Sequence, residues 1–295
     1  MKVRAKESLV QGMRAIVYNA KFVLLHWGTN AAFALILSAS LYYLLANSLS
    51  HSLSGSQLTL SIDYIWYIQF RELFKTNLDQ LPYTIYSVVG IYALVQTFYL
   101  AGLVSVFHHP KKNHFVDFFY GGVKYWFRFT KVTFVSLFFF GLAFLINDYL
   151  GEFIKWIFQR TEFIYADAIL RSLRYLVLLV LIALVTLVSD YTKIYLAIED
   201  ETKMWRGVYK TLIFLKNNFT IVFGMFLLIS VFGAVGAVVY NVVGTFIPKA
   251  PFYYLILVFF LQQMLIIFRL FIRMYFCATE VFLFKDLSAE IISEN

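Results

Sequence analysis

The chain has 295 residues, of which 61% are hydrophobic and only 14% are charged. Soluble domains carry about 25% charged residues, and chain size limits how much surface a fold can bury, so this much apolar surface cannot all be hidden from water. The excess must face lipid. The single cysteine, Cys277, excludes a disulfide within the chain and any zinc site built on several cysteines. The formal net charge is +8, and its distribution along a membrane protein matters more than its sum.

Six apolar runs are long enough to cross a bilayer as helices. A hydrocarbon core of ~30 Å needs about 20 apolar residues, and helices are required because lipid offers no partner for backbone N–H and C=O groups. We therefore predict an all-α, polytopic membrane protein with six transmembrane helices. The first run lies behind a charged lead-in and is predicted to be a retained helix rather than a cleaved signal peptide. The predicted spans are Phe22–Leu45, Thr84–Phe107, Val132–Tyr149, Leu173–Ile198, Phe219–Ile247 and Phe252–Phe276.

The distribution of positive charge predicts the orientation. With the N-terminus in the cytoplasm, 18 of the 25 Lys and Arg residues fall in cytoplasmic segments and 7 fall on the other side. Segments rich in Lys and Arg stay on the cytoplasmic side of a membrane. We therefore predict a multi-pass protein of the bacterial inner (cytoplasmic) membrane with both termini in the cytoplasm.

A pattern centred on Gly12, Gly122 and Gly207 repeats three times. Apolar residues follow each glycine at offsets that share one helical face, which predicts an amphipathic interfacial helix on the cytoplasmic side before each of three transmembrane hairpins. We treat residues 1–295 as a single membrane domain with candidate repeat units 1–107, 114–198 and 202–285. The alternative is chance, because amphipathic periods recur easily. A lysine follows nine residues after each glycine, at Lys21, Lys131 and Lys216.

Polar side chains within the spans have two interpretations. Small and polar residues commonly hold membrane helices together, so packing is one reading. The other is that four amides edge a polar cavity, which a transporter or channel for a small or amphiphilic solute would require. These four residues are Asn30, Gln96, Asn241 and Gln262.

Two charged positions lie near the inner ends of their spans. Asp190 is about 16 residues into the fourth span and Arg269 about 18 into the sixth, which places both near the inner interface. A charge at that depth is costly unless it is paired or reaches the headgroups. We predict an intramembrane ion pair between Asp190 and either Arg269 or Arg273, with separate contacts to the inner headgroups as the alternative.

We predict no catalytic, cofactor-binding or metal-binding residues. His108, His109, His114 and Asp117 form a conceivable metal cluster, but their spacing matches no known ligand pattern. No P-loop, GxSxG, HExxH or GxGxxG motif is present. An intramembrane enzyme acting on lipid would need His26, Asp190 and a hydroxyl in one cleft. The acidic corner Glu199–Glu201 is expected to be a solvated turn.

The basic lead-in segments have one predicted partner, the anionic headgroups of membrane lipids, which attract Lys and Arg at the surface. The simpler interpretation is that these basic residues only set the orientation of the chain in the membrane. No nucleic-acid-binding module accompanies the charge, so nucleic acid is not a predicted partner. Protein partners are unknown.

Several of these segments carry a resemblance. Asp190–Lys193, the acidic Glu199–Glu201 and the basic amphipathic helix after them resemble a broad group of uncharacterised bacterial inner-membrane proteins with six spans. That group includes the membrane domain fused to some glycerophosphodiester phosphodiesterases. Ala101–Leu103 and the segment after His114 look like the matching element of the first half. No phosphodiesterase domain is found within these residues, so no catalytic residue carries over.

Taken together, the sequence predicts a non-enzymatic structural or accessory component of the membrane, or a lipid-interacting one. A transporter or channel is the alternative, and the two differ in whether the four amides line a solvent-reachable cavity.

Overall fold

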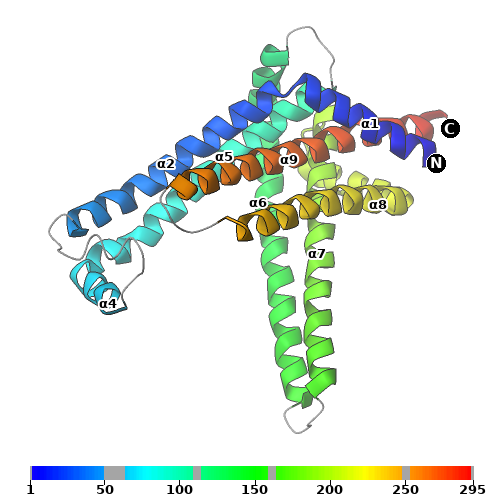
Figure 1. Cartoon of the computed structure of the whole chain (residues 1–295). Coiled ribbons are helices and arrows are strands. Elements are labelled where there is room, and N and C mark those ends of the chain that lie inside the picture. The colour runs from blue at the N-terminus through cyan, green and yellow to red at the C-terminus, as the bar shows by residue number, and fades with distance from the viewer. Residues whose placement is uncertain (1, 50–63, 109–113, 159–163, 248–252, 294–295) are drawn as a thin grey trace. The chain divides into compact units, whose positions relative to one another are not determined.

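The structure is a computed structural model and describes residues 2–49, 64–108, 114–158, 164–247 and 253–293. Within these ranges all regular secondary structure is helical (Figure 1). The all-α class is therefore confirmed. The helices are α1 Lys2–Tyr18, α2 Lys21–Leu49, α4 Tyr64–Leu73, α5 Lys75–His108, α6 His114–Phe158, α7 Ile164–Ile198, α8 Met204–Thr245 and α9 Tyr253–Ser293.

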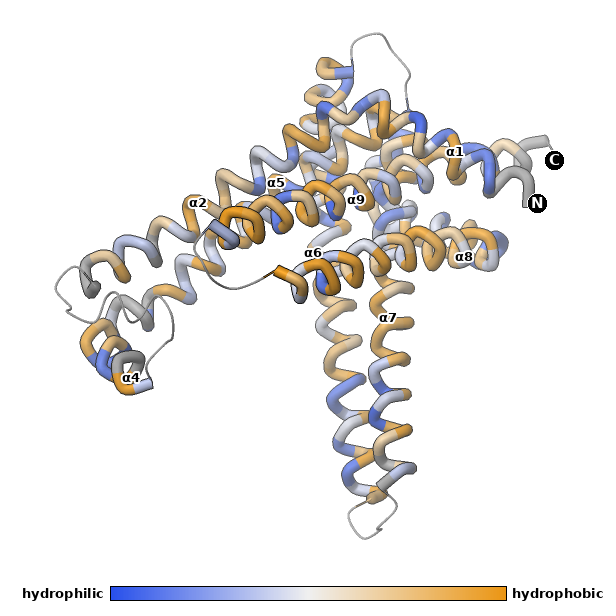
Figure 2. Tube along the Cα trace, in the orientation of Figure 1, coloured by the Kyte–Doolittle hydropathy of each residue, from blue (hydrophilic) through white to orange (hydrophobic). Residues whose placement is uncertain are grey.

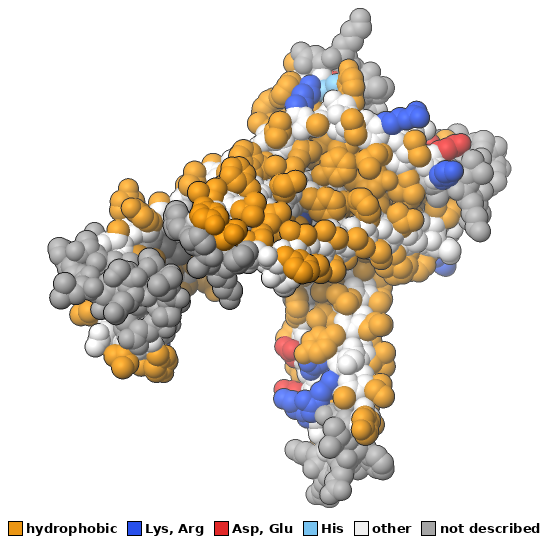
Figure 3. All heavy atoms as spheres, in the orientation of Figure 1, with side chains coloured by type: hydrophobic (Ala, Val, Ile, Leu, Met, Phe, Trp, Pro, Cys, Tyr) orange, Lys and Arg blue, Asp and Glu red, His pale blue; other side chains and the backbone are white. Residues whose placement is uncertain are grey.

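Six of these helices are long and apolar enough to cross a membrane, as predicted. Figure 2 shows long hydrophobic stretches along α7, α8 and α9. Hydrophobic side chains also cover most of the described surface that is visible in Figure 3. Such a surface is stable only against lipid, so the chain is a multi-pass membrane protein. The segments that qualify are Lys21–Ala39, Leu81–His108, His114–Phe158, Ala168–Ile198, Met204–Thr245 and Tyr253–Ala289.

The chain divides into two compact units. One comprises Met1–Ala20 with Thr97–Asn295, and the other comprises Lys21–Gln96. The boundary between them falls inside α5. These limits do not coincide with the three candidate repeat units, and the repeat remains a prediction.

Several helices are longer than the spans predicted for them. At 1.5 Å per residue the 45 residues of α6 extend about 67 Å, roughly twice a hydrocarbon core. The predicted interfacial segment and the span are continuous in α6. In α8 the same two parts are joined across a kink at Asn218, whose φ is −118° and ψ 19°. Only the N-terminal segment, α1, is a separate helix.

Two asparagines mark the breaks that do occur. Asn218 donates from its side-chain amide to the carbonyl oxygen of Phe214 at 3.1 Å. Asn19 does the same to Ala15 at 2.8 Å, directly before α2 begins. A side chain that bonds the backbone four residues earlier competes with the regular helix and favours a bend or an end. Both breaks lie within two residues of a lysine of the repeat pattern, Lys21 or Lys216.

The three aligned glycines all lie in close helix contacts within the first unit. A Cβ atom at Gly12 would lie 2.6 Å from Thr279 Oγ1 on α9. At Gly122 it would lie 2.6 Å from the Phe98 ring on α5, and at Gly207 it would lie 2.7 Å from the Leu196 side chain on α7. The basic segment that precedes a span therefore packs each time against another long apolar helix, and glycine lets the two helices approach.

Helix α1 packs along the C-terminal part of α9 (Figure 1). Ser8 donates a hydrogen bond to Asp286 at 3.1 Å, and the Tyr275 hydroxyl donates to the Leu9 carbonyl at 3.2 Å. Helix α9 thus continues well past Phe276, where the sixth span was predicted to end, because this extension supplies the surface on which α1 packs.

Candidate functional site

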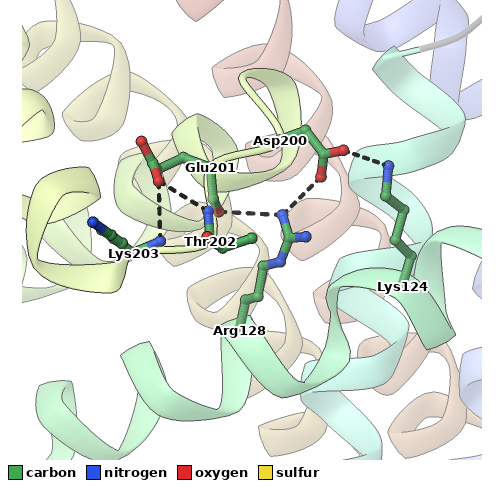
Figure 4. A network of polar contacts seen from close by, with 6 residues as sticks. All are labelled: Lys124, Arg128, Asp200, Glu201, Thr202 and Lys203. Atoms are coloured by element: carbon green, nitrogen blue, oxygen red, sulfur yellow. Dashed lines mark hydrogen bonds and ion pairs between the residues drawn. The ribbon is translucent and has the colours of Figure 1, made fainter.

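An ion-paired corner joins α6 to the connection between α7 and α8 (Figure 4). Asp200 accepts hydrogen bonds from Lys124 Nζ at 2.9 Å and from Arg128 Nη1 at 2.7 Å. The same Arg128 nitrogen donates to the backbone carbonyl of Glu201 at 3.2 Å. The acidic corner was expected to be a solvated turn. It is exposed, and it is also attached to a helix about 70 residues earlier in the chain.

Glu201 organises the start of α8. Its Oε1 accepts from the backbone N–H groups of Thr202 and Lys203, both at 3.1 Å, and its Oε2 accepts from Arg206 at 3.3 Å. A carboxylate at a helix N-terminus is favoured by the helix dipole and by unsatisfied N–H groups. These backbone hydrogen bonds, chiefly that from Lys203, lower the pKa of Glu201.

Asp200 adopts a left-handed backbone conformation with φ at 49°, the one positive φ of a non-glycine residue in the described chain. Aspartate and asparagine tolerate this region better than most residues. Hydrogen bonds from Lys124 and Arg128 lower the pKa of Asp200, because both cations favour its charged form. The corner is therefore held in one conformation by side chains from α6.

An apolar groove of about 300 Å³ lies beside this corner. It is formed by Val132–Phe139 of α6, Leu184–Thr192 of α7 and Met204–Leu212 of α8. Its size is at the lower end of small-molecule sites. All three walls belong to the same unit of the chain.

The groove is apolar even where its lining carries hydroxyl groups. Ser136 donates to the carbonyl of Val132 at 2.8 Å, and Thr192 donates to that of Val188 at 2.6 Å. Both hydroxyls are thus satisfied by their own helices and offer little to a polar ligand. Trp205, with 68% of its surface exposed, lies on the wall contributed by α8. Hydrocarbon is the chemistry that such a lining accommodates.

Basic side chains outnumber acidic ones where the groove meets the corner. Five stand against the three carboxylates of Glu199–Glu201. Among the described residues, Lys131 and Lys203 form no ion pair, and each directly precedes a groove residue in sequence. Lys131 Nζ lies 4.5 Å from the centroid of the Phe127 ring. The five basic residues are Lys124, Arg128, Lys131, Lys203 and Arg206.

A second charged cluster joins α7 to α9. Lys193 Nζ lies 3.4 Å from Asp190 Oδ1, one helical turn away, and the Lys193 side chain is only 9% exposed. Glu280 of α9, 8% exposed, interacts electrostatically with both residues. The predicted partners of Asp190, Arg269 and Arg273, are both exposed. The pair proposed between them and Asp190 remains a prediction, while Lys193 is the partner that the structure places beside Asp190.

The four amides of the predicted cavity lie in two different settings. In the second unit, Asn30 Oδ1 accepts from the Tyr92 hydroxyl at 2.8 Å and from Gln96 Nε2 at 3.3 Å. Gln96 Oε1 also meets His26 Nε2 at 2.5 Å. This network links α2 to α5. Asn241 and Gln262 belong to the first unit, where both side chains are exposed. A cavity shared by the four therefore remains a prediction.

The structure describes only part of the histidine cluster near the start of α6. His109 lies outside the described residues. Asp117 is buried, and the ring of His114 packs edge-on against Tyr18 with 5.7 Å between centroids. No group of three or more metal-ligating side chains occurs in the part of the chain that the structure describes.

Comparisons with protein-family models, with curated proteins and with solved structures find no match. The resemblance to six-span inner-membrane proteins accordingly remains a prediction.

Sequence reasoning overlooked Lys193 and Glu280. Glu280 is a lone acid in the apolar stretch 274–284, which is a visible signal, but it lies beyond the predicted end of the sixth span. The corner contacts of Lys124 and Arg128 left no local signal, because their partner is more than 70 residues away.

Proposed function

We propose that this chain is a non-enzymatic, lipid-interacting component of the bacterial inner membrane, and that the groove between α6, α7 and α8 holds a lipid acyl chain. The observation that carries this proposal is the composition of the groove. Two of its three hydroxyls, those of Ser136 and Thr192, donate to carbonyls of their own helices, and apart from Ser189 the other lining side chains are apolar. Burial of each methylene of an acyl chain contributes about 0.8 kcal/mol.

The proposal includes an arrangement in the membrane. Six spans would form three hairpins, and the basic lead-ins before α2 and at the start of α8 would lie on the cytoplasmic leaflet before their spans, whereas the lead-in at the start of α6 continues into its span as one helix. The excess of Lys and Arg on one side supports cytoplasmic termini. The helix breaks at Asn19 and Asn218 support a change of direction where two of the lead-ins meet their spans.

Filling the groove is expected to release bound lipid. Val208→Phe puts a ring where about two methylenes would lie, which corresponds to about 1.6 kcal/mol and about tenfold weaker binding. Native mass spectrometry of the protein purified in mild detergent measures the phospholipid that remains bound. Val231→Phe is the matched control, because Val231 lies on the same helix, is 60% exposed and does not line the groove. Equal lipid retention by the two variants would contradict the proposal.

A further inference from the structure

We infer that the groove selects an anionic phospholipid of the surrounding bilayer, with one acyl chain between α6, α7 and α8 and its headgroup at Lys131 and Lys203. This inference rests on the proposed function and names the ligand class of the same site. An acyl chain in the groove gives no role to the excess of basic side chains at the corner.

Two of the five basic side chains at the corner take no part in its ion pairs. Asp200 engages Lys124 and Arg128, and Glu201 engages Arg206 together with the backbone N–H groups of Thr202 and Lys203, directly before α8. Within the described residues these contacts leave Lys131 and Lys203 without a carboxylate partner. Two unpaired ammonium groups at a membrane surface attract anionic headgroups by about 1 kcal/mol each.

The position of these lysines matches the geometry of a phospholipid. Lys131 directly precedes Val132, the first groove residue of α6, and Lys203 directly precedes Met204, the first groove residue of α8. Both therefore stand at the same end of the groove, next to the corner that Arg128 and Glu201 hold together. An acyl chain entering from this end would extend along α6 for seven residues, or about 10 Å.

The corner also joins the two segments of backbone that carry these cations. Lys203 lies on a connection whose backbone is attached to α6 through Arg128, and α6 carries Lys131 three residues later. The backbone positions of the two lysines are thus held before lipid binds, which lowers the entropic cost of binding. A phosphate-bearing headgroup of net charge −1 is attracted by both ammonium groups, whereas a zwitterionic headgroup adds a cation that they repel.

Trp205 allows a direct test because it lines the groove. In a variant that keeps Trp205, with the other four tryptophans replaced by phenylalanine, fluorescence reports contact with lipid at this site. The protein is reconstituted into vesicles that contain phosphatidylglycerol or phosphatidylcholine with brominated acyl chains, which quench tryptophan. The replaced residues are Trp27, Trp66, Trp126 and Trp156.

We expect brominated phosphatidylglycerol to compete for this site about 30-fold better than brominated phosphatidylcholine, from two lysines at the surface. Lys131→Gln with Lys203→Gln removes the preference. The control pair Lys155→Gln with Lys216→Gln changes two exposed lysines that lie outside the groove segments and keeps the preference. Native mass spectrometry of the unmodified chain with equal amounts of the two lipids gives the same ranking without tryptophan replacement.

The outcomes separate this inference from the proposed function. Equal quenching by the two lipids, unchanged in Lys131→Gln with Lys203→Gln, overturns the headgroup site and leaves the acyl-chain site standing. No quenching of Trp205 by either brominated lipid overturns both.

Discussion

Replacing Lys193 by methionine is expected to lower the free energy of unfolding by about 3–5 kcal/mol. Lys193 is a buried cation that contacts Asp190 of its own helix and interacts electrostatically with Glu280 of α9. Removing it leaves the acidic groups of Asp190 and Glu280 without this cation, and Glu280 is nearly fully buried. Breaking a buried pair by deleting one partner is costly, because the remaining charge has no compensation. Reversible unfolding of the detergent-solubilised protein in increasing SDS measures the change.

A second substitution separates charge from packing. Glu280→Gln in the Lys193→Met background removes one of the uncompensated charges and is expected to recover a large part of the loss. Lys210→Met, at an exposed position of α8, removes the same type of side chain with little effect. The electrostatic explanation fails if Lys193→Met is as stable as Lys210→Met. It also fails if the double variant, Lys193→Met with Glu280→Gln, is less stable than Lys193→Met alone.

Replacing glycine by alanine at two positions of α6 is expected to change the stability of the protein in opposite directions, because only one of the two positions contacts α5. Gly121 faces α5 so closely that a Cβ atom would lie 2.5 Å from Ser105 Oγ and 3.3 Å from the Ala101 carbonyl oxygen. Gly121→Ala is therefore expected to destabilise the protein by about 1–3 kcal/mol through overpacking. At Gly141, on the same helix, nothing lies within 4 Å. Gly141→Ala is expected to leave stability unchanged or to raise it by up to about 1 kcal/mol, because alanine is the better helix former.

Unfolding in SDS measures the stability of both alanine variants, and Gly121→Ala is expected to be the less stable of the two. A Gly121→Ala protein as stable as Gly141→Ala would mean that α5 and α6 do not approach as closely as described.

The spans were predictable because the bilayer imposes a simple rule on composition. A run of about 20 apolar residues has few alternatives to a membrane helix, so all six helices followed from the sequence. Their ends did not follow. Helix α9 continues past Phe276 and α6 begins at His114, so both helices extend beyond the apolar runs from which the spans were predicted.

The polar contacts were less predictable for a different reason. The partner of Asp190 was predicted from the depth of charged residues in their spans. Arg269 and Arg273, on another helix, were chosen because they lie at a similar depth. The structure places Lys193 beside it, at a spacing of three residues along the same helix. The groove could not be predicted at all, because it requires α6, α7 and α8 to be placed together. Of the two lysines at its end, only Lys131 belongs to the repeat pattern that was noted in the sequence.

The proposed function requires a chain that crosses the membrane six times with the Asp200 corner on the cytoplasmic side. The single cysteine makes this measurable: Cys277→Ala provides a background without thiols, into which Thr202→Cys or Lys155→Cys is introduced. Labelling with a membrane-impermeant maleimide in intact spheroplasts is expected to modify the cysteine at position 155 and to reach position 202 only after the membrane is opened. Labelling of position 202 in intact spheroplasts, or recovery of the protein in the soluble fraction without detergent, would contradict the account.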